Sequence, residues 1–155
     1  MSGPAAALAR TIMDRTLYMV LATAGRDGQP WASPVYFATA DHAEFLWVSS
    51  PAATHSLNIA VRPRVGIVIF DSQAPIGTGQ GVYILAHATE LPDADLGRAI
   101  QIFSRRSRQH GGLAWNPDDV RGEALLRLYS ATALNYSMLA KDGQPDHRVK
   151  IEIGA

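Results

Sequence analysis

The sequence predicts a mainly β domain with helices (α+β), an antiparallel β-barrel of six to seven strands with a short and a long helix at its periphery. Two observations carry this prediction. Apolar segments of strand length are joined by short turns, which favours antiparallel pairing, and the strands are long, which favours a barrel over an open sheet. The 155 residues, 47% hydrophobic and 18% charged, suit one compact domain over 1–155.

The composition argues against several classes of protein. The formal net charge is zero, which is unfavourable for a general nucleic-acid binder. The chain has no cysteine, so it has no disulfide, thiolate metal site or cysteine nucleophile. No apolar run approaches the roughly 20 residues that span a bilayer, and the N-terminal segment does not resemble a signal peptide. We therefore expect a cytoplasmic protein that binds neither membrane nor nucleic acid.

The N-terminal third begins with a helix and continues in strands. The helix follows from one-sided apolar spacing at Ala5, Leu8, Ala9, Ile12 and Met13. Strands are predicted over 17–22, 31–39 and 44–49, the first two forming a hairpin. Pro34 lies inside the second strand. Because proline cannot donate to a strand ladder, this segment is expected at an edge, at a bulge, or where the backbone faces a ligand.

Two further helices alternate with the remaining strands. A short helix is predicted from about 54 to 61, capped by Thr54 or Ser50. Strand 65–70 is apolar on both faces and is therefore expected to be central, and strand 82–90 follows. The longest helix begins after Pro92 with an apolar stripe at Leu96, Ala99, Ile100 and Phe103. Its last turns carry Arg105, Arg106 and Arg108, interpreted as a solvated helix terminus. Contact with an acidic partner is the alternative. Strands 125–140 and 147–153 complete the barrel.

Residues 49–58 are the first candidate for chemistry. They place Ser49, Ser50, Thr54 and His55 where a strand end leads into a helix N-terminus. Free N–H groups and the positive end of the helix dipole form an anion site there, and a bound phosphate would favour protonated His55. An ordinary capped helix with a solvated histidine explains the same residues.

The other patterns are weaker. The glycine-rich segment 77–81 opens a strand, whereas a dinucleotide-binding loop opens a helix, so we interpret it as a turn with Gln80 at a strand start. The five histidines form no i, i+4 pair, which is unfavourable for a metal site, although haem would need one histidine ligand. No GxSxG motif indicates acyl transfer, and no acidic pair stands out for glycoside hydrolysis.

Taken together, these segments resemble the pyridoxamine 5'-phosphate oxidase-like family of FMN-binding split barrels, especially its small single-domain bacterial members. The resemblance runs from about Thr16 to Ile153. It rests on WASPVYF at 31–37, VSS at 48–50, THSLNIAVRPRV at 54–65, IVIFDS at 67–72, GTGQGVYILAHA at 77–88, LYSATALNYSML at 128–139 and DHRVKIEI at 146–153.

The resemblance implies a homodimer with FMN at the subunit interface. The residues that it assigns to the cofactor are Ser33, Pro34, Val35 and Tyr36 beside the isoalloxazine ring, Val48, Ser49 and Ser50 near the ribityl chain and phosphate, Thr54, His55 and Asn58 at the phosphate helix, Gln80 against the flavin, and Arg148 near an arginine that the partner subunit contributes.

The sequence departs from the family in its charges. Ser33 stands where the oxidase has a basic residue, and Thr54-His55 replaces an Arg-Lys pair, so a phosphate would lose fixed positive charge. The C-terminal substrate signature of the oxidase is also unmatched. These departures favour weak, pH-dependent flavin binding or a different cofactor, and we do not expect oxidation of pyridoxamine phosphate.

The leading hypothesis is an FMN-dependent oxidoreductase in which hydride reaches or leaves flavin N5. No side chain need be an obligatory acid or base, so no catalytic residue is assigned. Its partners would be a small-molecule substrate and NAD(P)H. A deazaflavin-dependent reductase is the alternative within the fold. A non-enzymatic carrier or sensor of haem or flavin is the alternative from another class.

Overall fold

The computed structural model describes residues 3–154, which form three helices, two short 3-10 turns and eight strands. The helices are α1 (Pro4–Arg15), α2 (Thr54–Val61) and α3 (Leu96–Gln109). The strands are β1 (Tyr18–Ala24), β2 (Pro30–Tyr36), β3 (Ala38–Ala40), β4 (Glu44–Ser49), β5 (Arg64–Phe70), β6 (Gly81–Glu90), β7 (Arg127–Leu139) and β8 (Arg148–Ile151). The 3-10 turns cover Asp93–Asp95 and Pro117–Val120.

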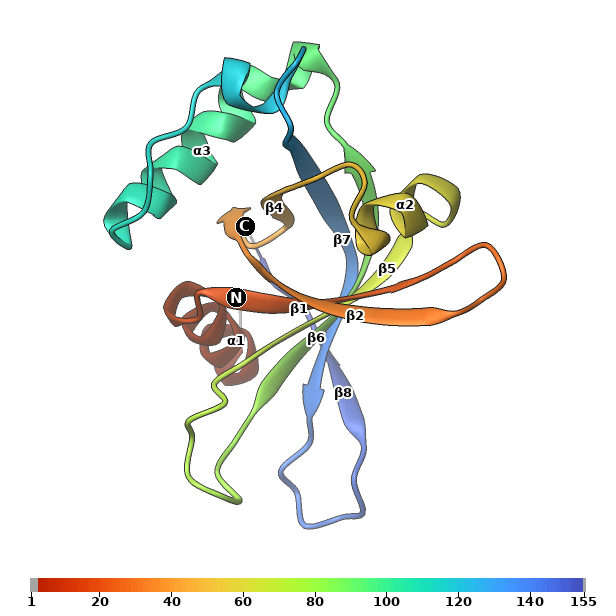
Figure 1. The fold of residues 1–155 in the computed structure, drawn as a ribbon. Coiled ribbons are helices and arrows are strands. Elements are labelled where there is room, and N and C mark those ends of the chain that lie inside the picture. The colour runs from red at the N-terminus through yellow and green to blue at the C-terminus, as the bar shows by residue number, and fades with distance from the viewer. Residues whose placement is uncertain (1–2, 155) are drawn as a thin grey trace.

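The strands form one strongly curled antiparallel sheet, so the predicted split barrel is confirmed (Figure 1). Seven strands follow the order β2-β1-β5-β6-β7-β4-β3, and β8 pairs with the C-terminal end of β7. Figure 1 shows α3 at one end of the barrel and the β5–β6 and β7–β8 connections at the other. The sheet therefore has two ends with different coverings.

The predicted strand 31–39 is wrong in one respect, because it is two strands. β2 pairs with β1, whereas β3 pairs with β4, and these partners lie on opposite sides of the sheet order. The chain changes from one edge to the other at Phe37, whose side chain is fully buried. This crossing closes the barrel and raises the strand count to eight.

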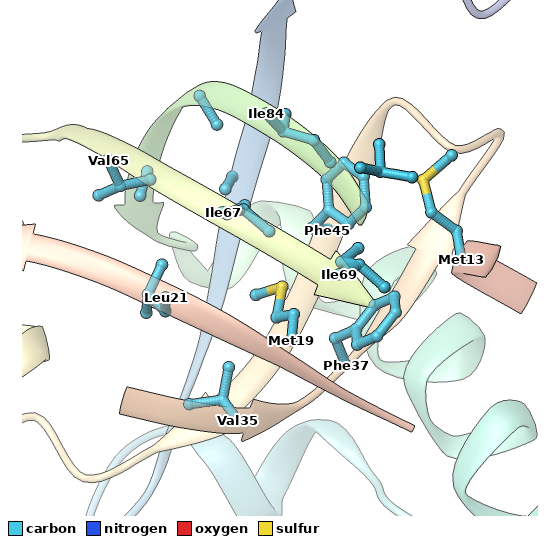
Figure 2. Close-up of a cluster of buried hydrophobic side chains, with 14 of the residues drawn as sticks. Met13, Met19, Leu21, Val35, Phe37, Phe45, Val65, Ile67, Ile69 and Ile84 are labelled. Atoms are coloured by element: carbon cyan, nitrogen blue, oxygen red, sulfur yellow. The ribbon is translucent and has the colours of Figure 1, made fainter. Parts of the chain in front are cut away.

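The barrel interior is filled by the inward-facing side chains of every second strand position. Met19 and Leu21 of β1 meet Ile67 and Ile69 of β5, with Phe37 close by (Figure 2). β5 lies between β1 and β6, which confirms its predicted central position. Burying such side chains removes roughly 25 cal/mol of unfavourable hydration per Å² of apolar surface.

A second apolar cluster holds α3 against the outside of β3, β4 and β7. The predicted stripe is buried, with exposed fractions of 4% or less for all four of its residues, and it packs on Ala38, Leu46 and Leu128. This packing fixes α3 as a wall beside the ends of β2 and β4.

Two local predictions are wrong. α2 begins after Ala53, which caps it without a side-chain hydrogen bond, and Ser50 Oγ instead accepts a hydrogen bond from the Ala52 amide. Arg106 is not solvated at the end of α3. Its guanidinium donates to the carbonyls of Met13, Asp14 and Thr16 and lies 5.0 Å from the centre of the Phe37 ring. It thereby supplies partners for carbonyls at the C-terminal end of α1.

Candidate functional site

A cleft of about 400 Å³ lies where β2, β4 and α2 approach α3. Six of the twelve residues predicted to bind a cofactor line it: Pro34, Val35, Tyr36, Val48, Ser49 and His55. Its remaining walls come from α3 and from the segment between α3 and β7, namely Phe103, Ser107, Leu113, Trp115 and Leu126. Three segments distant in the sequence therefore meet in one opening.

The floor of the cleft is an edge strand. β2 has β1 as its single neighbour in the sheet that the described residues form, with Pro34 opposite Val20. Along its other edge, the backbone N–H and C=O groups have no strand partner. This agrees with the prediction that a proline-bearing strand lies at an edge. It leaves unpaired backbone carbonyls and N–H groups along that edge, with no N–H at Pro34.

Ser49 and His55 form the polar end of the cleft. Ser49 Oγ lies 2.7 Å from His55 Nε2, joining the end of β4 to the first turn of α2. His55 is 8% exposed, and burial lowers the pKa of its imidazole from 6.5 because the charged form loses its hydration. The neutral ring is thus the resting form near pH 7.

The first turn of α2 adds backbone donors at the same place. Its N-cap residue Ala53 has no side chain able to accept from the N2 and N3 amides, which are His55 and Ser56 N–H. An anion lying against Ser49 and His55 would find these amides and the positive end of the helix dipole.

Tyr36 connects the floor of the cleft to α3. Its hydroxyl lies 2.8 Å from His110 Nδ1, and its ring meets Phe103 edge to face at 5.7 Å between centroids. Burial raises the pKa of the Tyr36 phenol above 10.0, with the nearby Arg106 opposing that rise. Tyr36 is therefore a neutral hydrogen-bonding group at working pH.

The other six predicted residues do not line this cleft. Ser33 accepts a hydrogen bond from Trp31 Nε1, and Ser50 accepts one from the Ala52 amide in the turn before α2. Thr54 is exposed. Asn58 donates to Thr23 Oγ1 in a buried contact that ties α2 to β1.

Gln80 and Arg148 both lie beside Leu139, the last residue of β7: the Gln80 side chain contacts its carbonyl, and Arg148 is opposite it in the β7–β8 pair. This is the end of β7 from which β8 follows, away from α3 (Figure 1). The Gln80 side-chain amide makes three hydrogen bonds: it donates to the Leu139 carbonyl and accepts from the amides of Leu139 and Gly81. The Arg148 guanidinium lies 4.1 Å from the centre of the Tyr83 ring. Within one chain, neither residue reaches Ser49.

The donor set fits a phosphate without fixed cationic partners. No arginine or lysine lines the cleft in the part of the chain that the structure describes. Arg127 is paired with Ser49 on the neighbouring strand β7, but its guanidinium donates to the carbonyls of Gly122, Ala124 and Leu126. One hydroxyl, one imidazole and the helix amides remain, which suffices for an anion but not for the strong grip of an Arg-Lys pair.

Sequence reasoning missed the α3 side of the cleft. Phe103 was expected to belong to the helix core, and Ser107, Leu113, Trp115 and Leu126 were not singled out. The sequence did contain a signal. Leu113 and Trp115 are large apolar residues in a loop-like segment rich in glycine and turn formers, and large apolar residues in an exposed loop often mark a binding surface.

The comparison with protein families decides what kind of split barrel this is. A family model described as pyridoxamine 5'-phosphate oxidase matches residues 6–138. The chain belongs to this family. The cleft is lined by residues of three segments, 31–37, 48–50 and 54–65, that carried the resemblance to the pyridoxamine 5'-phosphate oxidase family.

Solved structures share the fold at low sequence identity. A heme binding protein from Mycobacterium smegmatis has a TM-score of 0.74 and 21% identity over 97% of this chain, which spans 59% of that protein. HutZ, the heme storage protein from Vibrio cholerae, has a TM-score of 0.65 and 18% identity, covering 80% of this chain and 86% of its own. An F420 reductase has a TM-score of 0.61 and 19% identity, covering 83% and 94%. Among curated proteins no match is found.

Within residues 3–154, no cluster of three or more histidine, aspartate or glutamate side chains is arranged to hold a metal ion. No helix in the same range combines the length and apolar character needed to cross a bilayer.

Proposed function

We propose that this chain is a homodimeric, FMN-dependent oxidoreductase whose cofactor lies along β2 with its phosphate at Ser49 and His55. The observation that carries the proposal is the meeting of an unpaired strand edge and an anion site in one cleft. Unpaired backbone N–H and C=O groups match the polar pyrimidine edge of a flavin, whereas most of a porphyrin's rim is hydrocarbon.

Each part of the cleft has a role in holding the cofactor. The β2 edge would pair with the polar rim of the ring, and Tyr36 and Val48 would pack beside it. Ser49 Oγ and the α2 amides would donate to the phosphate, and His55 would gain a proton as the anion approached. The bound flavin supplies hydride transfer, while the protein orients it and limits access of water.

A dimer would complete the site from the outer face of the barrel. A shallow groove of about 420 Å³ on this face, lined by residues of β1, β5, β6, β7 and β8, contains one charged side chain, Arg148. Tyr18 and Leu85 on the same face are 59% and 44% exposed. Packing two such faces together would bury apolar surface and carry Arg148 of each subunit toward the cleft of the other.

The first experiment is a titration of the purified full chain with FMN, followed by flavin absorbance and fluorescence. Saturable binding in the micromolar range is expected. Ser49→Ala and His55→Ala should each weaken it by about tenfold, the scale of one lost hydrogen bond. Thr54→Ala removes an exposed hydroxyl outside the cleft and serves as the matched control. Equal binding by all four proteins, or no binding by the parent chain, would contradict the proposal.

The second experiment tests the dimer and the activity. Light scattering should give twice the chain mass, and Leu85→Arg should give a monomer that binds FMN poorly, whereas Leu125→Arg, at an 86% exposed position outside the groove, should not. The FMN complex should oxidise NADH or NADPH in the presence of an electron acceptor. A monomeric parent chain with full FMN affinity would refute the shared site.

A haem carrier or sensor is the second candidate, favoured by the neutral, largely apolar walls of the cleft. Addition of haem should then give a Soret band that is lost on replacing His55 or His110, and turnover of nicotinamide cofactors should be absent. A deazaflavin cofactor is distinguished in the same titrations by competition with FMN.

A further inference from the structure

The wall of the cleft opposite β2 is apolar and rigidly built. Phe103 and Trp115 meet edge to face at 5.8 Å between ring centroids, and Leu113, although 74% exposed, lines the opening beside them. Ser107 Oγ donates to the Leu113 carbonyl at 2.7 Å, and a Cβ at Gly112 would lie 2.5 Å from Ser107 Oγ. The leucine is therefore held at the rim by local geometry, and the wall presents rings and aliphatic carbon to the cleft.

A second groove, of about 500 Å³, adjoins the cleft and shares Trp115 with it. Its α3 side consists of Gln101, Ser104, Arg105, Arg108 and Gln109, spaced i, i+3, i+4, i+7 and i+8 along one stripe of the helix. Trp115 lies between the two openings because its amide donates to Ser104 Oγ at 2.8 Å while its ring contacts Phe103 on the neighbouring stripe.

The two groove arginines are not neutralised by the acids of the nearby segment. Asp118 pairs with Arg121 at 2.6 Å, and Asp119 Oδ2 accepts from the Asn116 amide at 2.8 Å. Arg106, the remaining arginine of the cluster, points to the opposite side of α3 and is occupied by the end of α1. Arg105 and Arg108 are exposed and, among residues 3–154, take part in no ion pair.

The geometry points to an aromatic carboxylic acid as the ligand of this side of the site: its ring lies in the cleft against Phe103, Leu113 and Trp115, and its carboxylate extends past Trp115 to Arg105 and Arg108. This inference rests on the proposed function in one respect: the aromatic ring of the ligand would face FMN, which the proposed function places along β2 on the opposite side of the cleft. The carboxylate of the ligand would bind the arginines of α3, and Ser49 and His55 would remain available to the phosphate of FMN.

The test compares two probes of one shape, 2-naphthoate and its neutral amide 2-naphthamide. Binding to the full chain, with and without saturating FMN, is followed by calorimetry and by quenching of tryptophan fluorescence. The acid should bind several-fold more tightly than the amide, and its advantage should shrink as salt is raised from low to physiological ionic strength. Equal affinities for the two probes, or no binding of either, would overturn the inference.

Surface variants locate the two halves of the ligand. Arg105→Gln and Arg108→Gln should each weaken the acid by up to about fivefold, the upper range for an exposed ion pair, and leave the amide unchanged. Arg64→Gln, an exposed arginine on β5, is the charge control. Leu113→Asp should weaken both probes, whereas Leu125→Asp, on the same segment but outside the cleft, should weaken neither.

The failure of this inference is separable from failure of the proposed function. Probe binding that follows this pattern without FMN binding would retain the aromatic-acid site and remove the flavin assignment. FMN binding with probes that ignore Arg105, Arg108 and Leu113 would retain the flavin assignment and remove the aromatic-acid site.

Discussion

The two ends of the β6–β7 ladder differ in what their polar residues do. At the α2 end, Ser49, His55 and the first helical turn face an open cleft and have few partners besides one another. At the other end, the polar atoms of Gln80 are used by the chain's own backbone. The family resemblance assigned both ends to the cofactor. The difference teaches that the two ends of one chain do not share a cleft. Gln80 would reach a cofactor held at Ser49 and His55 only from a second copy, as in the proposed dimer.

The largest expected effect is on stability, and it tests the hydrophobic core that supports both ends of the barrel. Phe37 is fully buried at the crossing from β2 to β3. Phe37→Ala should lower the free energy of unfolding by about 3–5 kcal/mol, because it leaves a cavity in the core that supports both ends. Denaturant unfolding measures this, with the 44% exposed Phe70→Ala as control. A loss below about 1 kcal/mol would mean that the crossing is not a core element.

The next effect separates structure from binding at the far end. Gln80→Ala should lower the free energy of unfolding by about 2 kcal/mol, because it leaves the Leu139 amide and carbonyl without their partner. Gln73→Ala, an exposed residue on the same connection, should change it little. If Q80A instead kept its stability and lost FMN affinity, Gln80 would act on the cofactor from the partner subunit rather than as a backbone clamp.

The cleft end should respond to pH through His55. Burial holds the pKa of His55 in the free protein below 6.5, and a bound phosphate would raise it by favouring the charged ring. FMN should therefore bind more tightly as pH falls from the pKa of the bound form toward the lower pKa of the free form. A gain of up to about tenfold is expected by titration at several pH values, and His55→Gln should flatten it.

The same shift has the opposite sign for the stability of the unliganded protein. The folded pKa lies below the unfolded value, so the unfolded chain binds the proton first. The contribution of His55 to stability is therefore complete above pH 6.5 and is lost as pH falls through the folded pKa. Unfolding curves with H55Q as reference would show this, and a contribution that grows on acidification would contradict it.

The smallest effect concerns the helix cap. Ala53→Ser supplies the missing N-cap hydroxyl and should stabilise the unliganded protein by about 1 kcal/mol. The same hydroxyl would occupy amides that the phosphate needs, so FMN affinity should fall. Ala53→Val offers no acceptor and is the control for side-chain size. Higher stability with unchanged FMN affinity would show that the α2 amides are not part of the site.

Particular elements show how far sequence reasoning reached. The strand 44–49 was predicted with the bounds that the structure has, and the short helix was predicted to end near Val61, where it does end. The break at Phe37 was not predicted, since every residue from 31 to 39 is compatible with a strand and the break depends on which partner each half meets. The cap failed for a related reason: Ser50 and Thr54 have the right chemistry, but the turn places Ala53 at the cap position.

The candidate site divides in the same way. Residue type and spacing identified Ser49 and His55, whose contact spans six positions of the chain. They did not identify Phe103, Leu113 and Trp115, which join the cleft only because α3 packs beside β4 and β3. Likewise, three arginines in four positions looked equivalent, yet helical rotation turns Arg106 toward α1 and leaves Arg105 and Arg108 in a groove.

The amino-acid order alone determined the antiparallel barrel, its central strand and the polar segment leading into α2, because hydrophobic periodicity and turn chemistry act over a few neighbouring residues. Tertiary structure alone decided where the chain crosses the barrel, which half of the predicted residues share a cleft, and which aromatic wall faces them. Those outcomes depend on contacts between segments that are distant in the sequence. The energies of such contacts cannot be inferred from the residues of one short segment.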